Sequence, residues 1–244
     1  MPFSYPYKLG RLTASKARKI KWVWSSLTGN STESLRAEYG VGFEMAGVIR
    51  EQTGQSVDPS LNQVITKLTS RLSNVVRNKL HQFEANVVCE QSPSAYALPG
   101  GFIFITQALT ELCERDHDEM AFVIAHEMAH VIRRHAINRL LRQTAYSAAS
   151  VMTPGSGAVA PWLRQVGMHW LEGAYSRDQE YEADALGGLL VKSAGFDPDG
   201  AIRLLTRFLA LEPTSGSLGL GEYLSTHPPV KSRIASLKSH LKRD

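Results

Sequence analysis

Two histidines and two carboxylates in this chain have the spacing of a metal site. The stretch HEMAH, residues 126–130, places His126 and His130 four residues apart, with Glu127 beside the first. On an α-helix such a pair lies on one face, so both imidazoles can direct a nitrogen at the same point. A tetrahedral Zn²⁺ accepts imidazole nitrogens at about 2.0–2.1 Å, which this pair satisfies. Glu127 can reach a water on that metal and act as a general base.

HExxH is a short pattern that also arises by chance, so the alternative is a core helix with incidental histidines. The surrounding residues are apolar, and burying these side chains without partners is costly, which favours a metal. The third ligand must come from elsewhere. His135 lies nine residues after His126, about 900° around a continuous helix, so we expect it on the opposite face. The extended pattern HExxHxxGxxH fails, since Arg133 and Ala136 stand at its last two key positions.

A second stretch, SRDQEYEAD at residues 176–184, offers the missing groups. Glu180 and Asp184 are four residues apart on one helical face. Glu180 can ligate the metal while Asp184 accepts a hydrogen bond from a ligand histidine and orients it. Glu182 is rotated by about 200° from Glu180, and we expect it to face solvent.

These residues require helices to hold them, and the hydrophobic periodicity predicts a predominantly helical α+β fold. The short runs FEANVVCEQ and GFIFIT, separated by SPSAYALPG, predict two strands that form an antiparallel pair. We expect residues 1–57 to be a peripheral, partly helical segment and residues 58–244 to be one compact catalytic domain. The first predicted helix of this domain begins at Asp58-Pro59. The next runs from Asp118 to about Gln143 and contains HEMAH, and another runs from about Trp162 to Ser193. Two further helices are predicted in the stretches DPDGAIRLLTRFLALEP and STHPPVKSRIASLKSHLKRD.

Composition excludes several classes of protein. No stretch approaches the roughly 18 to 20 apolar residues of a membrane span, and the N-terminus lacks the order of a signal peptide. The net charge of +4 is modest, and no nucleic-acid recognition motif accompanies it, so we expect no nucleic-acid partner. A basic run followed by Trp22 and Trp24 leaves a peripheral membrane contact open.

Four motifs in order, AYALPGGFIFIT, HEMAH, SRDQEYEAD and STHPPVKSRI, resemble the zinc metallopeptidases of the HtpX, CaaX-prenyl-protease and BepA kind. The resemblance covers roughly residues 60 to 240. It implies a zincin-like domain with one Zn²⁺ per chain held by His126, His130 and Glu180. It makes Glu127 the catalytic glutamate and Asp184 the hydrogen-bonding partner of a ligand.

The resemblance implies two further roles. In such enzymes the strand after an ALPGG-like turn pairs with substrate backbone, which would make Gly100, Gly101 and Phe102 substrate-binding residues; the alternative is an ordinary hairpin with a glycine turn. His227 is similar to a family histidine that approaches the zinc from a mobile segment, either as an inhibitory fourth ligand or to stabilise the oxyanion. Its alternative role is to cap the C-terminal helix.

The predicted function is therefore that of a zinc-dependent metalloendopeptidase in which Glu127 assists the attack of zinc-bound water on a peptide bond. The expected substrates are unfolded or misfolded polypeptides in protein quality control. Because the flanking transmembrane helices of some relatives are absent, the soluble branch is favoured, whose members work in the periplasm or cell envelope. The rival is a metal-bearing chaperone or assembly factor whose site is closed by His227.

Overall fold

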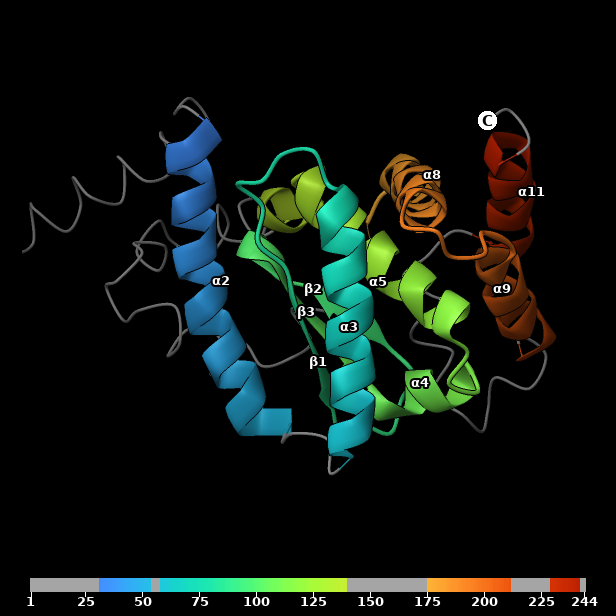
Figure 1. Ribbon diagram of the computed structural model, residues 1–244, viewed down its shortest axis with the longest axis horizontal. Coiled ribbons are helices and arrows are strands. Elements are labelled where there is room, and N and C mark those ends of the chain that lie inside the picture. Colours follow the sequence, from blue (N-terminus) through green and yellow to red (C-terminus); the bar gives the residue numbers. More distant parts are fainter. Residues whose placement is uncertain (1–30, 54–57, 140–174, 212–228, 242–244) are drawn as a thin grey trace, which may run out of the picture.

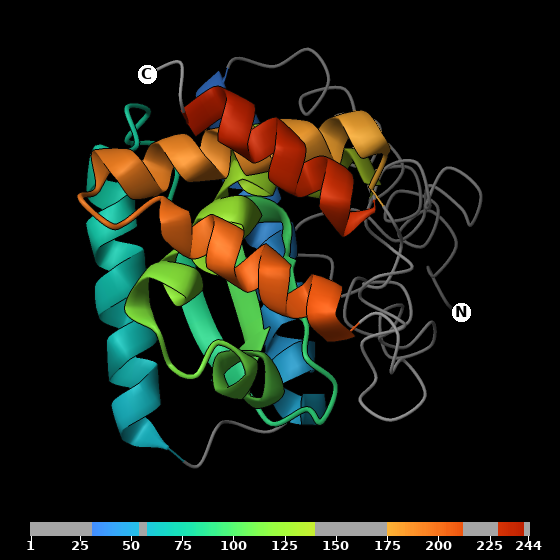
Figure 2. The same ribbon diagram turned by 90° about the vertical axis from the view of Figure 1, so that its right-hand side faces the viewer.

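Helix α5 is the centre of the fold, with a small sheet and α3 on one side and α8, α9 and α11 on the other (Figures 1 and 2). The computed structural model describes residues 31–53, 58–139, 175–211 and 229–241. The elements are α2 (Ser31–Thr53), α3 (Pro59–Val75), β1 (Glu84–Val88), β2 (Ala95–Ala97), the 3₁₀ turn η1 (Pro99–Gly101), β3 (Phe102–Thr106), α4 (Gln107–Leu112), α5 (His117–Ile132), α8 (Arg177–Ser193), α9 (Asp199–Leu211) and α11 (Val230–Leu241). The predicted α+β, mainly helical class is confirmed.

The sheet is mixed, which corrects the predicted antiparallel pair. Its order is β1-β3-β2: β3 runs parallel to β1, with Glu84 opposite Phe102, and antiparallel to β2, with Tyr96 opposite Phe104. Parallel neighbours require a connection of about a dozen residues. The segment between β1 and β3 is long enough for that connection and contributes β2 on the way.

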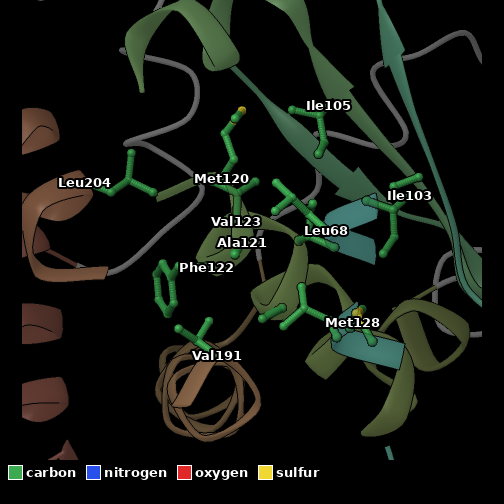
Figure 3. Close-up of a cluster of buried hydrophobic side chains, with 14 of the residues drawn as sticks. Leu68, Ile103, Ile105, Met120, Ala121, Phe122, Val123, Met128, Val191 and Leu204 are labelled. Carbon is green, nitrogen blue, oxygen red and sulfur yellow. The ribbon is translucent and has the colours of Figure 1, made fainter. Parts of the chain in front are cut away.

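The core lies where α5 meets the sheet on one side and the later helices on the other. Figure 3 shows Ile103 and Ile105 of β3 and Leu68 of α3 beside α5. Val191 of α8 and Leu204 of α9 lie on the side of α5 that faces the later helices. Every residue of α5 from Glu119 to Val131 is buried, as its nearly uninterrupted apolar pattern predicts. A helix enclosed in this way can hold its side chains in fixed orientations.

The helix starts follow local capping chemistry. The Asp58 carboxylate accepts from the backbone N–H groups of Ser60 and Leu61, so that α3 begins at Pro59 as predicted, and the Thr106 hydroxyl caps α4. Helix α5 is capped by Asp116 rather than by the predicted Asp118. Ser176 and Gln179 form a capping box that starts α8; the predicted stretch of that helix from residue 162 to 174 lies outside the described residues.

Helix α2, which lies within the predicted N-terminal segment, packs on the rest of the described fold. A Cβ added at Gly42 would lie 1.8 Å from the carbonyl oxygen of Pro99, so the helix rests directly on η1. Its Glu38 is paired with Arg134, just beyond α5. The apolar side chains on this side of α2 are buried, namely Val41, Met45, Ala46, Val48 and Ile49. The basic run with Trp22 and Trp24 lies outside the described residues.

Among the described helices, none is both long and apolar enough to span a bilayer.

Candidate metal centre

Two helices, the buried α5 and the partly exposed α8, carry the candidate ligands and pack against each other. Gly187 permits their close approach: a Cβ there would lie 3.1 Å from the backbone nitrogen of His126. Glu180, Asp184 and Gly187 follow helical spacing, so the glycine brings both carboxylates toward α5. The ligand-bearing faces are therefore held together by helix packing and not by a flexible loop.

His126, His130 and Glu180 converge as the sequence predicts, each offering one atom to a common point. The two Nε2 atoms are 3.2 Å apart. The Glu180 oxygens lie 3.5 Å from His126 Nε2 and 3.4 Å from His130 Nε2. A tetrahedral zinc with ligand distances of about 2.0–2.1 Å places its ligand atoms about 3.3 Å apart. The two Glu180 distances involve different oxygens, Oε2 and Oε1, and one ligand atom from each of the three residues lies within 4.8 Å of the others, so the donor set can close on one cation.

Asp184 supports His126 and is itself held by a residue that sequence reasoning missed. Its Oδ1 lies 3.0 Å from His126 Nδ1. Arg233 of α11 donates to both Asp184 oxygens, at 2.8 and 2.7 Å, and its Nη1 is 3.9 Å from Glu180. All of these side chains are buried. The available signal was the position of Arg233 inside the quoted motif STHPPVKSRI.

Burial and charge act differently on the two ligand histidines. Burial opposes protonation of His126, but the Asp184 and Glu180 carboxylates raise its pKa to about 9. Burial lowers the pKa of His130 to about 3. Burial also opposes ionisation of Asp184, yet Arg233 and His126 hold its pKa well below the ordinary range. The two carboxylates thus favour positive charge at His126, while burial keeps the His130 ring neutral.

Glu127 is buried beside the candidate ligands. Burial raises its pKa to about 6, which suits a group that exchanges protons near neutral pH. It lines a small cavity whose other walls are Phe122, Val123, His126, Leu204, Leu205, Phe208 and Arg233. Glu127 is not among the three residues whose ligand atoms converge.

His135 does not lie on the far face of the helix, and that prediction is wrong. Helix α5 ends at Ile132, well before the predicted Gln143, and Arg134 has a φ of 60°. The chain therefore turns back, and His135 Nδ1 comes to 3.1 Å from His130 Nδ1. Glu182, expected in solvent, is about half exposed and places an oxygen 3.3 Å from His135 Nε2.

Tyr175 is a second residue that the motifs did not single out. Its ring stacks on that of His130, with the centroids 3.9 Å apart and the planes 17° from parallel. The guanidinium of Arg139 lies 4.4 Å from the centroid of the same tyrosine ring. The available signal was its place directly before the quoted SRDQEYEAD.

The strand that follows the glycine turn is enclosed by neighbouring segments, and its predicted role in substrate binding stays a prediction. Strand β3 is hydrogen-bonded on both sides, and Phe102 is buried against Tyr39 of α2. Gly100 and Gly101 have φ values of 80° and 97°; added Cβ atoms would meet Tyr39 Cα at 2.4 Å and the Gln82 carbonyl oxygen at 1.8 Å. These glycines admit close neighbouring segments of the same chain. His227 lies outside the described residues.

Comparison with known proteins agrees with this arrangement. The model of peptidase family M48 matches residues 56–241. The chain is 33% identical over 165 residues to the mitochondrial metalloendopeptidase OMA1 of Schizosaccharomyces pombe, covering 66% of this chain and 47% of the relative. It is 30% identical over 224 residues to the OMA1 of Arabidopsis thaliana, covering 86% and 45%.

A bacterial relative matches over a similar length. The chain is 28% identical over 227 residues to the β-barrel assembly-enhancing protease of Escherichia coli K12, covering 87% of this chain and 45% of that protein. The chain thus spans less than half the length of these relatives. The family match covers most of the chain and includes all three converging residues. This chain belongs to peptidase family M48.

Proposed function

We propose that this chain is a zinc-dependent metalloendopeptidase, with His126, His130 and Glu180 as the zinc ligands. The observation that carries the proposal is the convergence of His126, His130 and Glu180, whose ligand atoms lie within 4.8 Å of one another next to a buried glutamate. Membership of a peptidase family and the metalloendopeptidase relatives support it.

The chain's own residues divide the proposed work among them. Bound zinc would polarise the scissile carbonyl and acidify the attacking water. Glu127 takes the proton of that water and later returns it to the leaving nitrogen. Asp184 keeps the Nδ1 proton of His126 in place, so that Nε2 carries a free lone pair. Arg233 balances the charge of Asp184 inside the core.

The proposed substrates are polypeptides, in particular unfolded or misfolded chains in protein quality control. Two kinds of observation support this: the family is a peptidase family, and one group of relatives is named for enhancing β-barrel assembly. Which polypeptides this chain cuts is part of the proposal, because the chain covers less than half the length of those relatives.

The test combines zinc analysis with cleavage of an unfolded protein such as casein. Glu127→Gln should keep one zinc per chain and lower the cleavage rate by at least about 100-fold, since the base is lost. Glu180→Ala should lose zinc and activity together. Glu111→Gln, the same change at an exposed position of α4, is the matched control and should behave as wild type.

Two outcomes would contradict the proposal. Full activity in Glu127→Gln would remove the glutamate mechanism. Stoichiometric zinc with no cleavage by wild type, even after His227→Ala, would favour a metal-bearing assembly factor instead.

A further inference from the structure

The ligand His130 has a hydrogen-bonded partner of its own, formed by a break in α5. Arg133 ends the helix, and the positive φ of Arg134 turns the chain so that residues 135–139 form a new helical turn. His135 is thereby buried with its Nδ1 atom 3.1 Å from His130 Nδ1. A continuous helix would have placed the two rings on different faces.

The proton positions follow from the chemistry of the two rings. If His130 Nε2 ligates a metal, that nitrogen carries no proton, and the proton of the neutral ring sits on Nδ1. His130 Nδ1–H then donates to His135 Nδ1, which must be unprotonated. The proton of His135 therefore sits on Nε2, 3.3 Å from an oxygen of Glu182. Only one pair of neutral tautomers satisfies both contacts.

The outer end of this chain of contacts is also held. The second Glu182 oxygen lies 3.0 Å from Arg133 Nε. Tyr175 stacks on the face of the His130 ring, so the hydrogen bond restrains the ring within its plane and the stack restrains its tilt.

We propose that His135 is a positioning residue: with Glu182 it fixes the tautomer and orientation of His130, so that Nε2 faces the metal. This inference rests on the metal site of the proposed function. It gives His130 a counterpart to the Asp184 contact of His126 and assigns a role to a histidine outside the HExxH motif. Groups in this position typically change metal affinity by 10- to 100-fold, an order-of-magnitude range.

The experiment measures the zinc dissociation constant by competition with a chelating dye, and the melting temperature of the metal-free protein. His135→Leu keeps apolar volume but removes the acceptor, and we expect zinc affinity to fall by about 10- to 100-fold. His135→Asn places an amide oxygen near the former Nδ1 position and should recover most of the affinity. His117→Leu, the same change at an exposed position at the start of α5, is the matched control.

If His135 only fills space in the core, His135→Leu should keep zinc affinity better than His135→Asn does, because leucine suits a buried site better than asparagine. Equal zinc affinity in wild type and His135→Leu would overturn the inference while leaving the proposed function intact. Absence of zinc from the wild type would remove both. An independent readout is the histidine side-chain NMR spectrum of the zinc-loaded protein: a proton on Nδ1 of His135 would also overturn the inference.

Discussion

The two ligand histidines lie one helical turn apart on α5, yet their surroundings differ. His126 contacts Asp184, which is paired with Arg233, and both of these side chains are about 1% exposed. His130 is backed by His135 and then by Glu182 and Arg133, whose side chains are 44% and 49% exposed. The support of His126, Asp184 with Arg233, is a buried ion pair and is called the dry support below. The support of His130 begins in the core at His135 and ends at the exposed side chains of Glu182 and Arg133. Charges in the first interact strongly, whereas those in the second are screened.

Removing the guanidinium of the dry support should have the largest effect. Arg233→Met leaves the buried Asp184 without its paired cation, and we expect the free energy of unfolding to fall by about 3–5 kcal/mol. Urea unfolding of the metal-free protein measures this. Lys231→Met, an exposed position on the same helix, is the control. A loss below about 1 kcal/mol would mean that the two supports are alike in energy.

The carboxylates should differ in their effect on the metal. Asp184→Asn removes the charge that faces His126, and we expect zinc affinity to fall by about 10- to 100-fold. Glu182→Gln should cost less, because the amide oxygen can still accept from His135 and the side chain is near solvent. Zinc titrations of both variants make the comparison, and equal losses would erase the distinction drawn between the two supports.

Two neighbouring glycines of α8 test how closely the dry support must pack. Gly187→Ala puts a methyl group 3.1 Å from the His126 backbone nitrogen, and we expect a loss of about 1–3 kcal/mol in stability. Gly188→Ala meets only leucine side chains, at 3.4 Å. It should be neutral or stabilising by up to about 1 kcal/mol, since alanine favours the helix. Thermal unfolding ranks the pair, and the opposite ranking would show that the α5–α8 contact yields easily.

The smallest effect is expected at the exposed end. Arg133→Met breaks an ion pair that is about half exposed, and we expect a stability change below about 1 kcal/mol. The difference from wild type should shrink further in 1 M salt, where screening is strong. Urea unfolding at low and high salt checks both points. A loss as large as that of Arg233→Met would show that this pair is coupled to the core.

Much of the site was predictable because it depends on local geometry. Residues four apart on a helix share a face, so HEMAH and the Glu180–Asp184 pair could be assigned before any fold was known. Asp58 and Thr106 cap helices for an equally local reason. Local spacing selected His126, His130 and Glu180, and the packing of α5 on α8 brings them together.

Other predictions failed where the outcome depends on distant segments. Strand β1 pairs in parallel with β3 because the connection that carries β2 and η1 brings the chain back in the same direction, and the two short strand patterns do not indicate this. The glycines at 100 and 101 indicated a close approach by another segment, and the structure shows that α2 and Gln82 make it. A sequence pattern reports that something approaches closely and does not report what.

The sequence by itself determined the family and the set of residues that can hold a metal, because ligand type and helical spacing are written locally. Only the tertiary structure decided what surrounds each ligand. Arg233 comes from a helix some fifty residues beyond Asp184. His135 reaches His130 because Arg134 has a positive φ, and arginine is not a residue type that predicts such a turn. The strain of that backbone, of order 1 kcal/mol or more, has to be offset by contacts such as Glu38 with Arg134, which exist only in the folded chain.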